Sequence, residues 1–380
     1  MTAPANKPRI VIIGAGATGR GQIGQVVHHA GFAITFIEKR LDLVEILRRA
    51  GMYTVGLAGE TVREIVIDGF DVLHKDDRTA CAEAIAVADI VATAVLPTNL
   101  ESTTQNLADG IDLRKTRGVQ KPLNVIACEN MERSSSTLRD YLRSSPAHTS
   151  SPGLDWNWID SHVAFPDSMV ARAVPVPTDP LFLLAEADQE WTVDASAVKQ
   201  PMPLLEGLTL SPNQTAALER KLYIKNTGHF AIGLAGLRKG YQLMDQATRD
   251  EEIFALVDAA TRESAAAVAA KHNFYPEQTE QYRSGFLRQM RSPFLPDEIV
   301  RVTREPMRKL GREERLVGPA MLCCEQNRPP KAIAHIIALA ILVADAECDP
   351  TLDGVCGIPR DHVLAGLVRR AYDEIAGGAA

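Results

Sequence analysis

The sequence lacks several features that mark specialised classes of protein. Its 380 residues carry no basic excess, because 41 Lys and Arg stand against 48 Asp and Glu, and a net charge of −7 argues against a nucleic-acid partner. The six cysteines form neither a C-x-x-C pair nor a metal-like spacing with histidine. We therefore expect reduced thiols, a cytoplasmic location and no metal site.

Long hydrophobic runs are also scarce. The N-terminal residues MTAPANKPRI include no apolar segment of the kind found in signal peptides, and we expect none. The most apolar stretch, residues 332–346, is too short to span a bilayer and contains His335, so we expect a buried helix and no membrane partner. With 46% hydrophobic and 23% charged residues, the composition fits a globular chain of two domains.

A glycine-rich turn near the start is the strongest local pattern. Residues 9–13 (RIVII) are apolar and β-branched, a helical pattern runs on to about Ala30, and between them stand Gly14, Ala15, Gly16, Ala17, Thr18 and Gly19. This is the G-x-G-x-x-G fingerprint in the strand–turn–helix context of dinucleotide-binding domains. Its glycines allow a tight turn, approach to a pyrophosphate and close packing of helix on strand, while the helix N-terminus offers N–H groups to phosphates.

The next strand ends in an acid that bears on the choice of cofactor. Residues 32–37 (FAITFI) are followed by Glu38, whose carboxylate can accept hydrogen bonds from the adenosine ribose hydroxyls. The same carboxylate would repel a ribose 2′-phosphate, so we expect the cofactor to be NAD. Lys39 and Arg40 follow directly and keep NADP as a less favoured alternative.

Two further apolar runs, residues 89–95 and 123–128, predict buried strands of the same sheet. Ligands of parallel sheets gather beyond the carboxyl ends of the strands. The backbone of Thr93 and Ala94 and the side chain of Asn130 are therefore expected to face the nicotinamide, although Asn130 could equally cap a helix. We also expect residues 181–187 and 191–194 to add strands to this sheet, and residues 144–153 to form an exposed loop.

The second half of the chain has a helical pattern. Long helices are expected in residues 216–238, 250–271 and 330–346, with a shorter one in 297–304, and the glycines at 228, 233 and 236 could divide the first. A Pro-rich run at residues 200–204 marks the boundary. The predicted architecture is an α/β Rossmann-type N-terminal domain, residues 1–204, followed by a mostly α-helical C-terminal domain, residues 205–380, with a ligand cleft between them.

The run ERKLYIKNTGHF, residues 219–230, contains a set of side chains suited to taking a proton from an alcohol. Lys221 supplies an amine, Asn226 a carboxamide and His229 an imidazole, at helical offsets of five and three residues. The spacing alone equally fits solvated surface residues. The fingerprint favours the chemical interpretation because it supplies a hydride acceptor.

A basic stretch lies farther along the chain. Its cations are Arg301, Arg304, Arg308, Lys309, Arg312 and Arg315, with three glutamates among them. One interpretation is a solvated basic face. The other is a pocket for an anionic, polyhydroxylated substrate, because Arg makes paired contacts with phosphate or carboxylate.

Several motifs together resemble a known family. They are GAGATGRGQIG at the start, PLNVIACENMERSSSTL at 122–138, HVAFPDSMVARAVP at 162–175, ERKLYIKNTGH at 219–229 and RVTREPMRKLGREERLVGP at 301–319. In order and spacing they resemble the mannitol-1-phosphate 5-dehydrogenases and, more broadly, the polyol-specific long-chain dehydrogenases of the mannitol dehydrogenase family. The resemblance covers nearly the whole chain.

The resemblance implies an NAD-dependent, metal-independent and monomeric oxidoreductase that interconverts mannitol 1-phosphate and fructose 6-phosphate. It implies that Lys221 is the general base, with its pKa lowered by burial. It implies that Asn130 and Asn226 hold the developing alkoxide and that His229 positions the substrate hydroxyl. Arg301 and Lys309 resemble the family's substrate-binding cations, and we add Arg304, Arg308 and Arg315 as candidates.

Three positions depart from the family pattern. Ala171 stands where the family usually has Asp, Leu96 stands where it has the Gly of an A-V-G-P turn, and Leu218 stands where some relatives have Glu. The loss of a carboxylate at Ala171 bears on the substrate. The alternatives are therefore oxidation of an unphosphorylated polyol such as mannitol, oxidoreduction of a hexuronate (fructuronate or tagaturonate), or NAD binding without catalysis.

Overall fold

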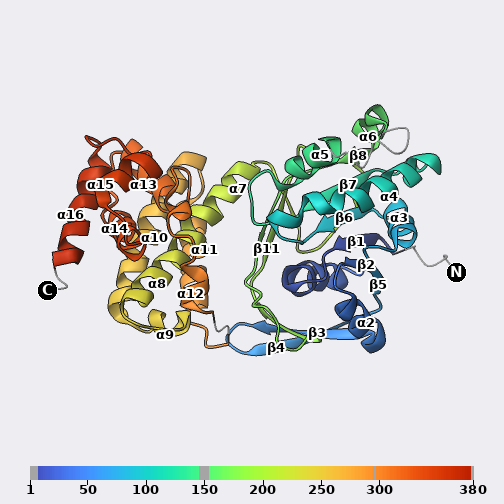
Figure 1. Cartoon of the computed structure of the whole chain (residues 1–380), viewed down its shortest axis with the longest axis horizontal. Helices are drawn as coiled ribbons and strands as arrows, with labels where there is room; N and C mark the ends of the chain where they lie inside the picture. The colour runs from blue at the N-terminus through green and yellow to red at the C-terminus, as the bar shows by residue number, and fades with distance from the viewer. Residues whose placement is uncertain (1–6, 145–153, 295–296, 378–380) are drawn as a thin grey trace. The chain divides into compact units, whose positions relative to one another are not determined.

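The computed structural model describes residues 7–144, 154–294 and 297–377 and divides into two compact units (Figure 1). Unit 1 is Met1–Ala217 and unit 2 is Leu218–Ala380. The predicted domain boundary after residue 204 lies shortly before this division and stays a prediction. The predicted loop at 144–153 lies, apart from Ser144, outside the described residues.

A six-stranded sheet with parallel pairing throughout forms the centre of unit 1. Its strands, in the order in which they pair, are β5 (Asp71–His74), β2 (Ala33–Glu38), β1 (Arg9–Ile13), β6 (Ile90–Thr93), β7 (Leu123–Ala127) and β8 (Val163–Ala164). The strands at the centre are apolar along their length because both faces are covered. In β1, Ile10 and Ile12 belong to one hydrophobic cluster, whereas Val11 and Ile13 belong to another.

Helices follow the strands along the chain. The cluster that contains Ile10 also takes side chains from the helical segment Gly19–Gly24, α1 (Gln25–His29) and α2 (Leu41–Ala50). The cluster that contains Val11 takes side chains from α3 (Arg78–Ala86), α4 (Thr104–Thr116), α5 (Ser134–Ser144) and α6 (Trp156–His162). The predicted α/β Rossmann-type N-terminal domain is therefore confirmed.

Two small sheets complete unit 1 and correct one expectation. The first has the order β10 (Phe182–Glu186), β3 (Met52–Ala58), β4 (Val62–Asp68), and the second has β12 (Thr209–Ser211), β11 (Glu190–Asp194), β9 (Ser168–Ala171). The prediction that residues 181–187 and 191–194 join the large sheet is wrong. Instead β10 pairs in parallel with β3, and Leu183 and Trp191 bury against the same core as Tyr53.

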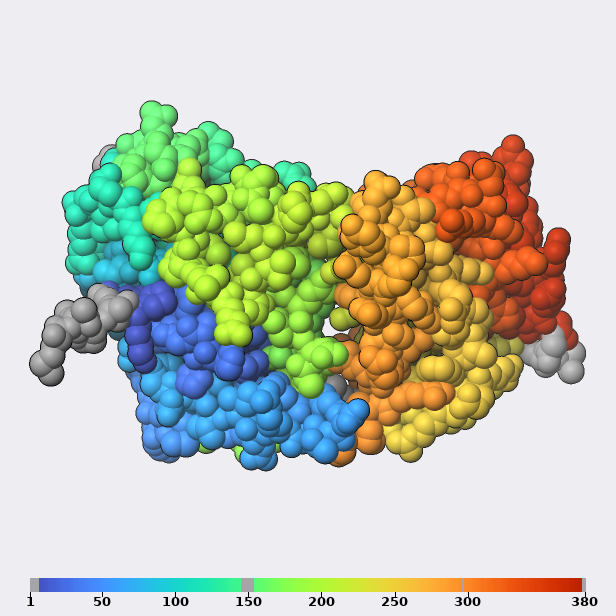
Figure 2. Space-filling model, turned by 180° about the vertical axis from the view of Figure 1, so that it is seen from behind, coloured from blue at the N-terminus to red at the C-terminus, as the bar shows by residue number. Residues whose placement is uncertain are grey.

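The β3–β4 hairpin was not expected from the sequence. Most residues of β4 are exposed, and the hairpin contributes to the surface drawn in blue in Figure 2. Since β4 pairs with β3 alone, it is an edge strand that needs few apolar residues. Its apolar side chains therefore do not form the continuous run that marked the strands of the large sheet.

The regular secondary structure that the described residues of unit 2 form is helical, apart from one isolated β-bridge between Leu243 and Glu298. Three consecutive segments, α7 (Gln214–Arg220), a π-helical segment (Lys221–Asn226) and α8 (Thr227–Arg238), form one continuous helix that begins in unit 1. The helices that follow are α9 (Met244–Thr248), α10 (Glu251–His272), α11 (Pro276–Met290), α12 (Ile299–Val302), α13 (Val317–Glu325), α14 (Lys331–Val343), α15 (Cys348–Pro350) and α16 (Val363–Gly377). The α14 helix is buried, as predicted. Among the helices that the structure describes, none combines the length and hydrophobicity needed to span a bilayer.

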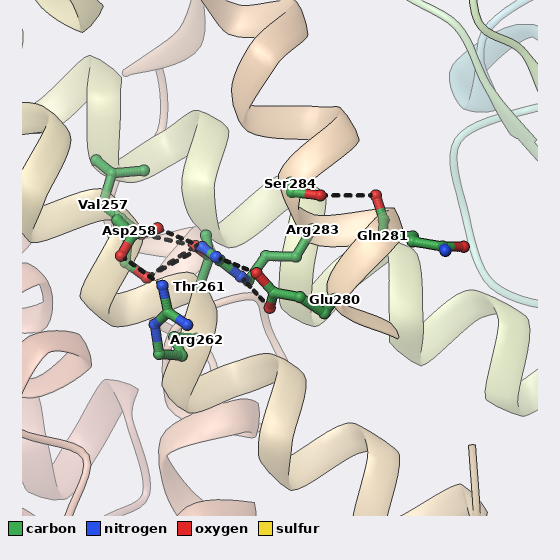
Figure 3. A network of polar contacts seen from close by, with 8 residues as sticks. All are labelled: Val257, Asp258, Thr261, Arg262, Glu280, Gln281, Arg283 and Ser284. Atoms are coloured by element: carbon green, nitrogen blue, oxygen red, sulfur yellow. Dashed lines mark hydrogen bonds and ion pairs between the residues drawn. The ribbon is translucent and has the colours of Figure 1, made fainter. Parts of the chain in front are cut away.

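Glycine does not break the α7–α8 helix but lets a neighbour approach it. A Cβ atom on Gly228 would lie 2.4 Å from Cε1 of Phe286 in α11 and 2.8 Å from Cγ2 of Thr261 in α10. Buried Arg283 joins these same two helices, because it bonds to Glu280 within α11 and to Asp258 in α10 (Figure 3). The helix that carries the predicted catalytic residues is therefore backed by a tightly packed pair of helices.

Candidate active site

The fingerprint turn has the shape that dinucleotide binding requires. Gly14 has φ of +103°, and a Cβ atom there would lie 2.5 Å from the carbonyl oxygen of Ala94. A Cβ atom on Gly19 would lie 1.9 Å from the carbonyl oxygen of Gly14, so neither glycine can be replaced without moving the backbone. At Gly16 nothing lies within 4 Å of such an atom, which leaves room for a pyrophosphate against the backbone.

Glu38 is connected to this turn by hydrogen bonds. One carboxylate oxygen accepts a bond of 2.8 Å from the backbone N–H of Ala15, and the other accepts bonds of 2.9 Å from the N–H groups of Lys39 and Arg40. A carboxylate has about four lone-pair sites, so it can also accept bonds from ribose hydroxyls. The Glu38 carboxylate is thus held beside the glycine turn, where the ribose of NAD is expected to bind.

Arg20, which was not predicted from the sequence, also holds the turn. Its side chain is buried, its Nε donates a bond of 2.6 Å to the carbonyl of Ala15, and its guanidinium also donates to the carbonyl of Pro180. Burial lowers the pKa of this guanidinium. Its position directly after the last glycine of the fingerprint was the available signal.

The carboxyl ends of β6 and β7 are joined by Glu129. Thr93 donates from its hydroxyl to this carboxylate over 2.7 Å, and the N–H of Val95 donates over 2.9 Å. Burial raises the pKa of Glu129. The N–H of Ala94 bonds to the carbonyl of Ile13, so the predicted nicotinamide-facing backbone is fixed by the sheet. Asn130 follows Glu129 and is exposed.

The π-helical segment changes the geometry of the predicted catalytic residues. In an α-helix, residues five apart are separated by about 140° around the axis. The wider turn from Lys221 to Asn226 reduces this separation, so the amine and the carboxamide project from nearer sides of the helix. His229 follows three residues later in α8, again on a neighbouring side. All three residues are partly buried.

His229 and Arg301 are linked by Asp297. The Nε2 atom of His229 lies 3.1 Å from Oδ2 of Asp297, and Nε of Arg301 donates to Oδ1 over 2.7 Å. A second bond joins the Arg301 guanidinium to Oδ2. Burial raises the pKa of Asp297, but the bonds from His229 and Arg301 outweigh it and bring the pKa to about 2. Sequence reasoning missed Asp297 because 68 residues separate it from His229.

The basic segment, residues 297–315, packs along the α7–α8 helix at further points. Nζ of Lys309 lies 4.9 Å from the ring centre of Phe230, the residue after His229. Thr227 donates from its hydroxyl to the carbonyl of Arg315. The structure thus brings this segment alongside the helix that carries the predicted catalytic residues.

The candidate cations differ in their surroundings. Lys309 is buried and donates to the carbonyl of Val302 over 2.7 Å, and burial with the nearby charges of Arg315 and Arg308 lowers its pKa to about 8. Arg308 pairs with Glu305 and Glu314, and Arg315 pairs with Glu314. Burial lowers the pKa of Arg315. Arg304 is exposed.

Two of the positions that depart from the family pattern, Ala171 and Leu218, have informative surroundings. Ala171 is buried at the end of β9. Glu219, next to Leu218, bonds to Lys271 and His272 over 2.7 Å each, so its carboxylate is engaged with the end of α10. Within the described ranges, no group of three or more His, Cys, Asp or Glu side chains could hold a metal ion.

Comparisons with known proteins match both units. The mannitol dehydrogenase Rossmann domain matches residues 8–207, and the mannitol dehydrogenase C-terminal domain matches residues 215–349. A mannitol-1-phosphate 5-dehydrogenase of Brevibacillus brevis is 37% identical over 94% of this chain and 96% of that protein.

Solved structures support the same fold. A substrate-free D-sorbitol dehydrogenase has a TM-score of 0.78 at 17% identity, over 99% of this chain and 95% of that one. The ternary complex of Pseudomonas fluorescens mannitol 2-dehydrogenase with NAD and D-mannitol has a TM-score of 0.72 at 16% identity, over 98% and 92%. With the family models and the Brevibacillus relative, these findings confirm the predicted family. The chain belongs to the mannitol dehydrogenase family.

Proposed function

We propose that this chain interconverts mannitol 1-phosphate and fructose 6-phosphate. As a member of the mannitol dehydrogenase family, it is an NAD-dependent oxidoreductase acting on the CH–OH group of a polyol. The observation that carries the choice of substrate is the 37% identity, over nearly the full length of both chains, to a relative named mannitol-1-phosphate 5-dehydrogenase. The basic segment beside the α7–α8 helix supports an anionic substrate.

In the proposed mechanism Lys221, in its neutral form, accepts the proton of the substrate hydroxyl. When bound, NAD supplies the hydride acceptor, so the alcohol carbon loses its hydride and the carbonyl forms. Asn130 and Asn226 donate hydrogen bonds to the oxygen as negative charge develops, and such donors contribute on the order of 3 kcal/mol each. His229 positions the hydroxyl. In the reverse direction protonated Lys221 returns the proton to the ketose oxygen.

For the cofactor, unit 1 supplies the residues. We assign the pyrophosphate to the backbone of Gly14, Ala15, Gly16, Ala17, Thr18 and Gly19, the ribose to Glu38, and the nicotinamide to the Thr93–Ala94 backbone. The open space at Gly16 and the bond from Ala15 to Glu38 support this assignment. Glu38 favours NAD over NADP because its charge would repel a 2′-phosphate.

For the substrate anion we assign Arg301, Arg304, Arg308, Lys309 and Arg315. Lys309 is mainly charged below its pKa of about 8 and loses its charge above it, so it can pair with a phosphate at neutral pH. The ion pairs of Arg301, Arg308 and Arg315 with carboxylates favour the second candidate, an unphosphorylated polyol, because their charge is already neutralised. The absence of a carboxylate at Ala171 does not distinguish an unphosphorylated polyol from a hexuronate.

A substrate panel tests the proposal. Mannitol 1-phosphate, mannitol, sorbitol and aldonates are offered with NAD, and fructose 6-phosphate, fructose, fructuronate and tagaturonate with NADH, with turnover followed by NADH absorbance. We expect the highest kcat/KM with the mannitol 1-phosphate and fructose 6-phosphate pair. A preference for mannitol or for a hexuronate would replace the substrate, and NADH binding without any turnover would establish a non-catalytic protein.

Lys221→Ala tests the assigned base. We expect kcat to fall by about 10²- to 10⁴-fold, the range for loss of a general acid–base group, with the dissociation constant of NADH unchanged. Lys225→Ala is the matched control, because this lysine belongs to the same π-helical segment and lies over the ring of Tyr282. Activity of Lys221→Ala near that of the control would show that another group is the base.

We further propose a monomer in the cytoplasm. All six cysteines are free in the structure, in agreement with a reducing compartment. Light scattering during size-exclusion chromatography tests the oligomeric state, and fractionation of the source cells tests the location.

A further inference from the structure

Asp297 stands outside the residues that sequence patterns select, yet it contacts two of them. Its carboxylate takes two bonds from the guanidinium of Arg301 and one contact of 3.1 Å from the imidazole of His229. Its backbone is fixed as well, because the carbonyl of Asp297 accepts a bond of 2.9 Å from the N–H of Met244 at the start of α9. Asp297 is therefore held through both its side chain and its backbone.

We propose that Asp297 is a positioning residue that fixes the ring of His229 and orients Arg301 beside it. The Nδ1 atom of His229 then accepts a hydrogen bond from a hydroxyl next to the one that Lys221 deprotonates, and so positions the reacting group. This inference deepens the proposed function and rests on it for the reaction. It adds a residue, and an assigned tautomer, that the family motifs do not contain.

The tautomer follows from the chemistry of the carboxylate. An ionised carboxylate only accepts hydrogen bonds, so the Nε2 atom that faces it must carry the proton. The second nitrogen, Nδ1, is then the acceptor of the neutral ring. Asp297 stays ionised throughout the neutral range, because its pKa of about 2 lies far below it.

Arg301 makes this arrangement rigid. Two bonds between a guanidinium and a carboxylate fix the plane of the carboxylate as well as its distance. With one edge of the carboxylate held by Arg301, Oδ2 remains aimed at the imidazole. A substrate anion that contacts Arg301 is then placed at a set position relative to His229.

The matched control is a second aspartate in the same unit. Asp245 forms an ion pair of 3.0 Å with Arg249 at the same i,i+4 spacing, and its side chain is 14% exposed against 16% for Asp297. It has a similar burial and partner without a histidine contact among the bonds that the structure gives it. Asp245→Asn therefore measures the general cost of removing such a pair.

The experiment compares Asp297→Asn with Asp245→Asn in the full chain. We expect Asp297→Asn to lower kcat/KM by about 10- to 100-fold, the range for loss of one charged hydrogen bond, with NADH affinity unchanged. Asp245→Asn should stay within about twofold of the parent. Asp297→Glu keeps the charge and should recover part of the loss. Equal activity of the two asparagine variants would overturn the proposal.

A double-mutant cycle separates positioning from general damage. If Asp297 acts through the imidazole, Asp297→Asn should cost less in a His229→Ala background than in the parent, because only its effect on Arg301 remains. An unchanged cost in that background contradicts action through His229.

Nuclear magnetic resonance of ¹⁵N-labelled histidine gives a readout without turnover, with the His229→Ala spectrum identifying the signals. The neutral ring should carry its proton on Nε2, and a proton on Nδ1 would refute the proposal even if the substrate panel fails. A protein that binds NADH and shows the Nε2–H ring, but turns over nothing, would contradict the proposed function and leave the placement of Asp297 intact.

Discussion

Leu96 adopts a backbone conformation that glycine adopts easily and leucine does not. Its φ is +80° and its ψ is 147°, close to a region populated almost only by glycine. The family resemblance places a glycine at this position. The strain lies three residues after Thr93, in the loop that follows β6 and precedes Pro97. A non-glycine residue there stores strain beside the proposed nicotinamide site.

Replacing Leu96 by glycine should therefore stabilise the chain. Strain of this kind costs about 1–3 kcal/mol, whereas the added freedom of glycine in the unfolded chain costs about 0.4–1 kcal/mol. The leucine side chain is 67% exposed, so little packing is lost. We expect a gain of about 1 kcal/mol in the free energy of unfolding, measured with urea. A loss of more than about 0.5 kcal/mol would show that Leu96 is not strained.

At the scale of elements, the π-helical segment and its glycine decide how the predicted catalytic residues are presented. Gly228 lies between Asn226 and His229 and faces Phe286 and Thr261 at distances that exclude a Cβ atom. The packing of α10 and α11 against this helix therefore fixes where both side chains lie.

Gly228→Ala should impair both folding and activity. The overpacked methyl group is expected to cost about 1–3 kcal/mol of stability. Displacement of the helix should lower kcat by about 10- to 100-fold, since misplacement by about 1 Å has effects of that size. The control is Gly366→Ala in α16, where a Cβ atom would meet nothing within 4 Å and which should stabilise by about 0.5–1 kcal/mol. Similar kcat values for the two variants would contradict this account.

The elements that the sequence predicted well are those with a local signal. The strands β1, β2, β6 and β7 are continuous apolar runs because both faces of the sheet are covered, and α14 is apolar for the same reason. The small sheets could not be predicted in this way. The partner of β10 is β3, more than a hundred residues earlier, and nothing in either pattern specifies that pairing.

The candidate site shows the same division. The glycine turn and Glu38 follow a local spacing rule, and the structure places them in hydrogen-bonding contact. By contrast, Asp297 is assigned by contacts with His229 and Arg301 that depend on how α8 and α12 pack. The π-helical turn at Lys221–Asn226 was also absent from the prediction, because a helical pattern does not distinguish a π segment from an α-helix.

At the scale of the whole molecule, the two units have separate hydrophobic cores. Two of the three large clusters consist of unit 1 residues on either face of the six-stranded sheet, and the third consists of unit 2 residues around α8 and α14. The residues assigned to NAD all belong to unit 1, whereas the assigned base and substrate cations belong to unit 2. Cofactor affinity and chemistry should therefore respond to different sets of substitutions.

This division predicts how NADH binding changes in three variants. Arg20→Met removes the donor that holds the Ala15 carbonyl, so the dissociation constant of NADH, measured by fluorescence, should rise about tenfold or more, as expected for a lost charged hydrogen bond. Arg114→Met is the control, because Arg114 is equally buried in unit 1 and donates only to carbonyls away from the fingerprint in the bonds that the structure describes. It should lose stability while keeping NADH affinity.

Lys221→Ala should bind NADH like the parent. Its free energy of unfolding should therefore rise by about 2.7 kcal/mol when NADH is added at a hundred times the dissociation constant. A weakening in Lys221→Ala as large as that in Arg20→Met would show that cofactor affinity does not belong to unit 1 alone.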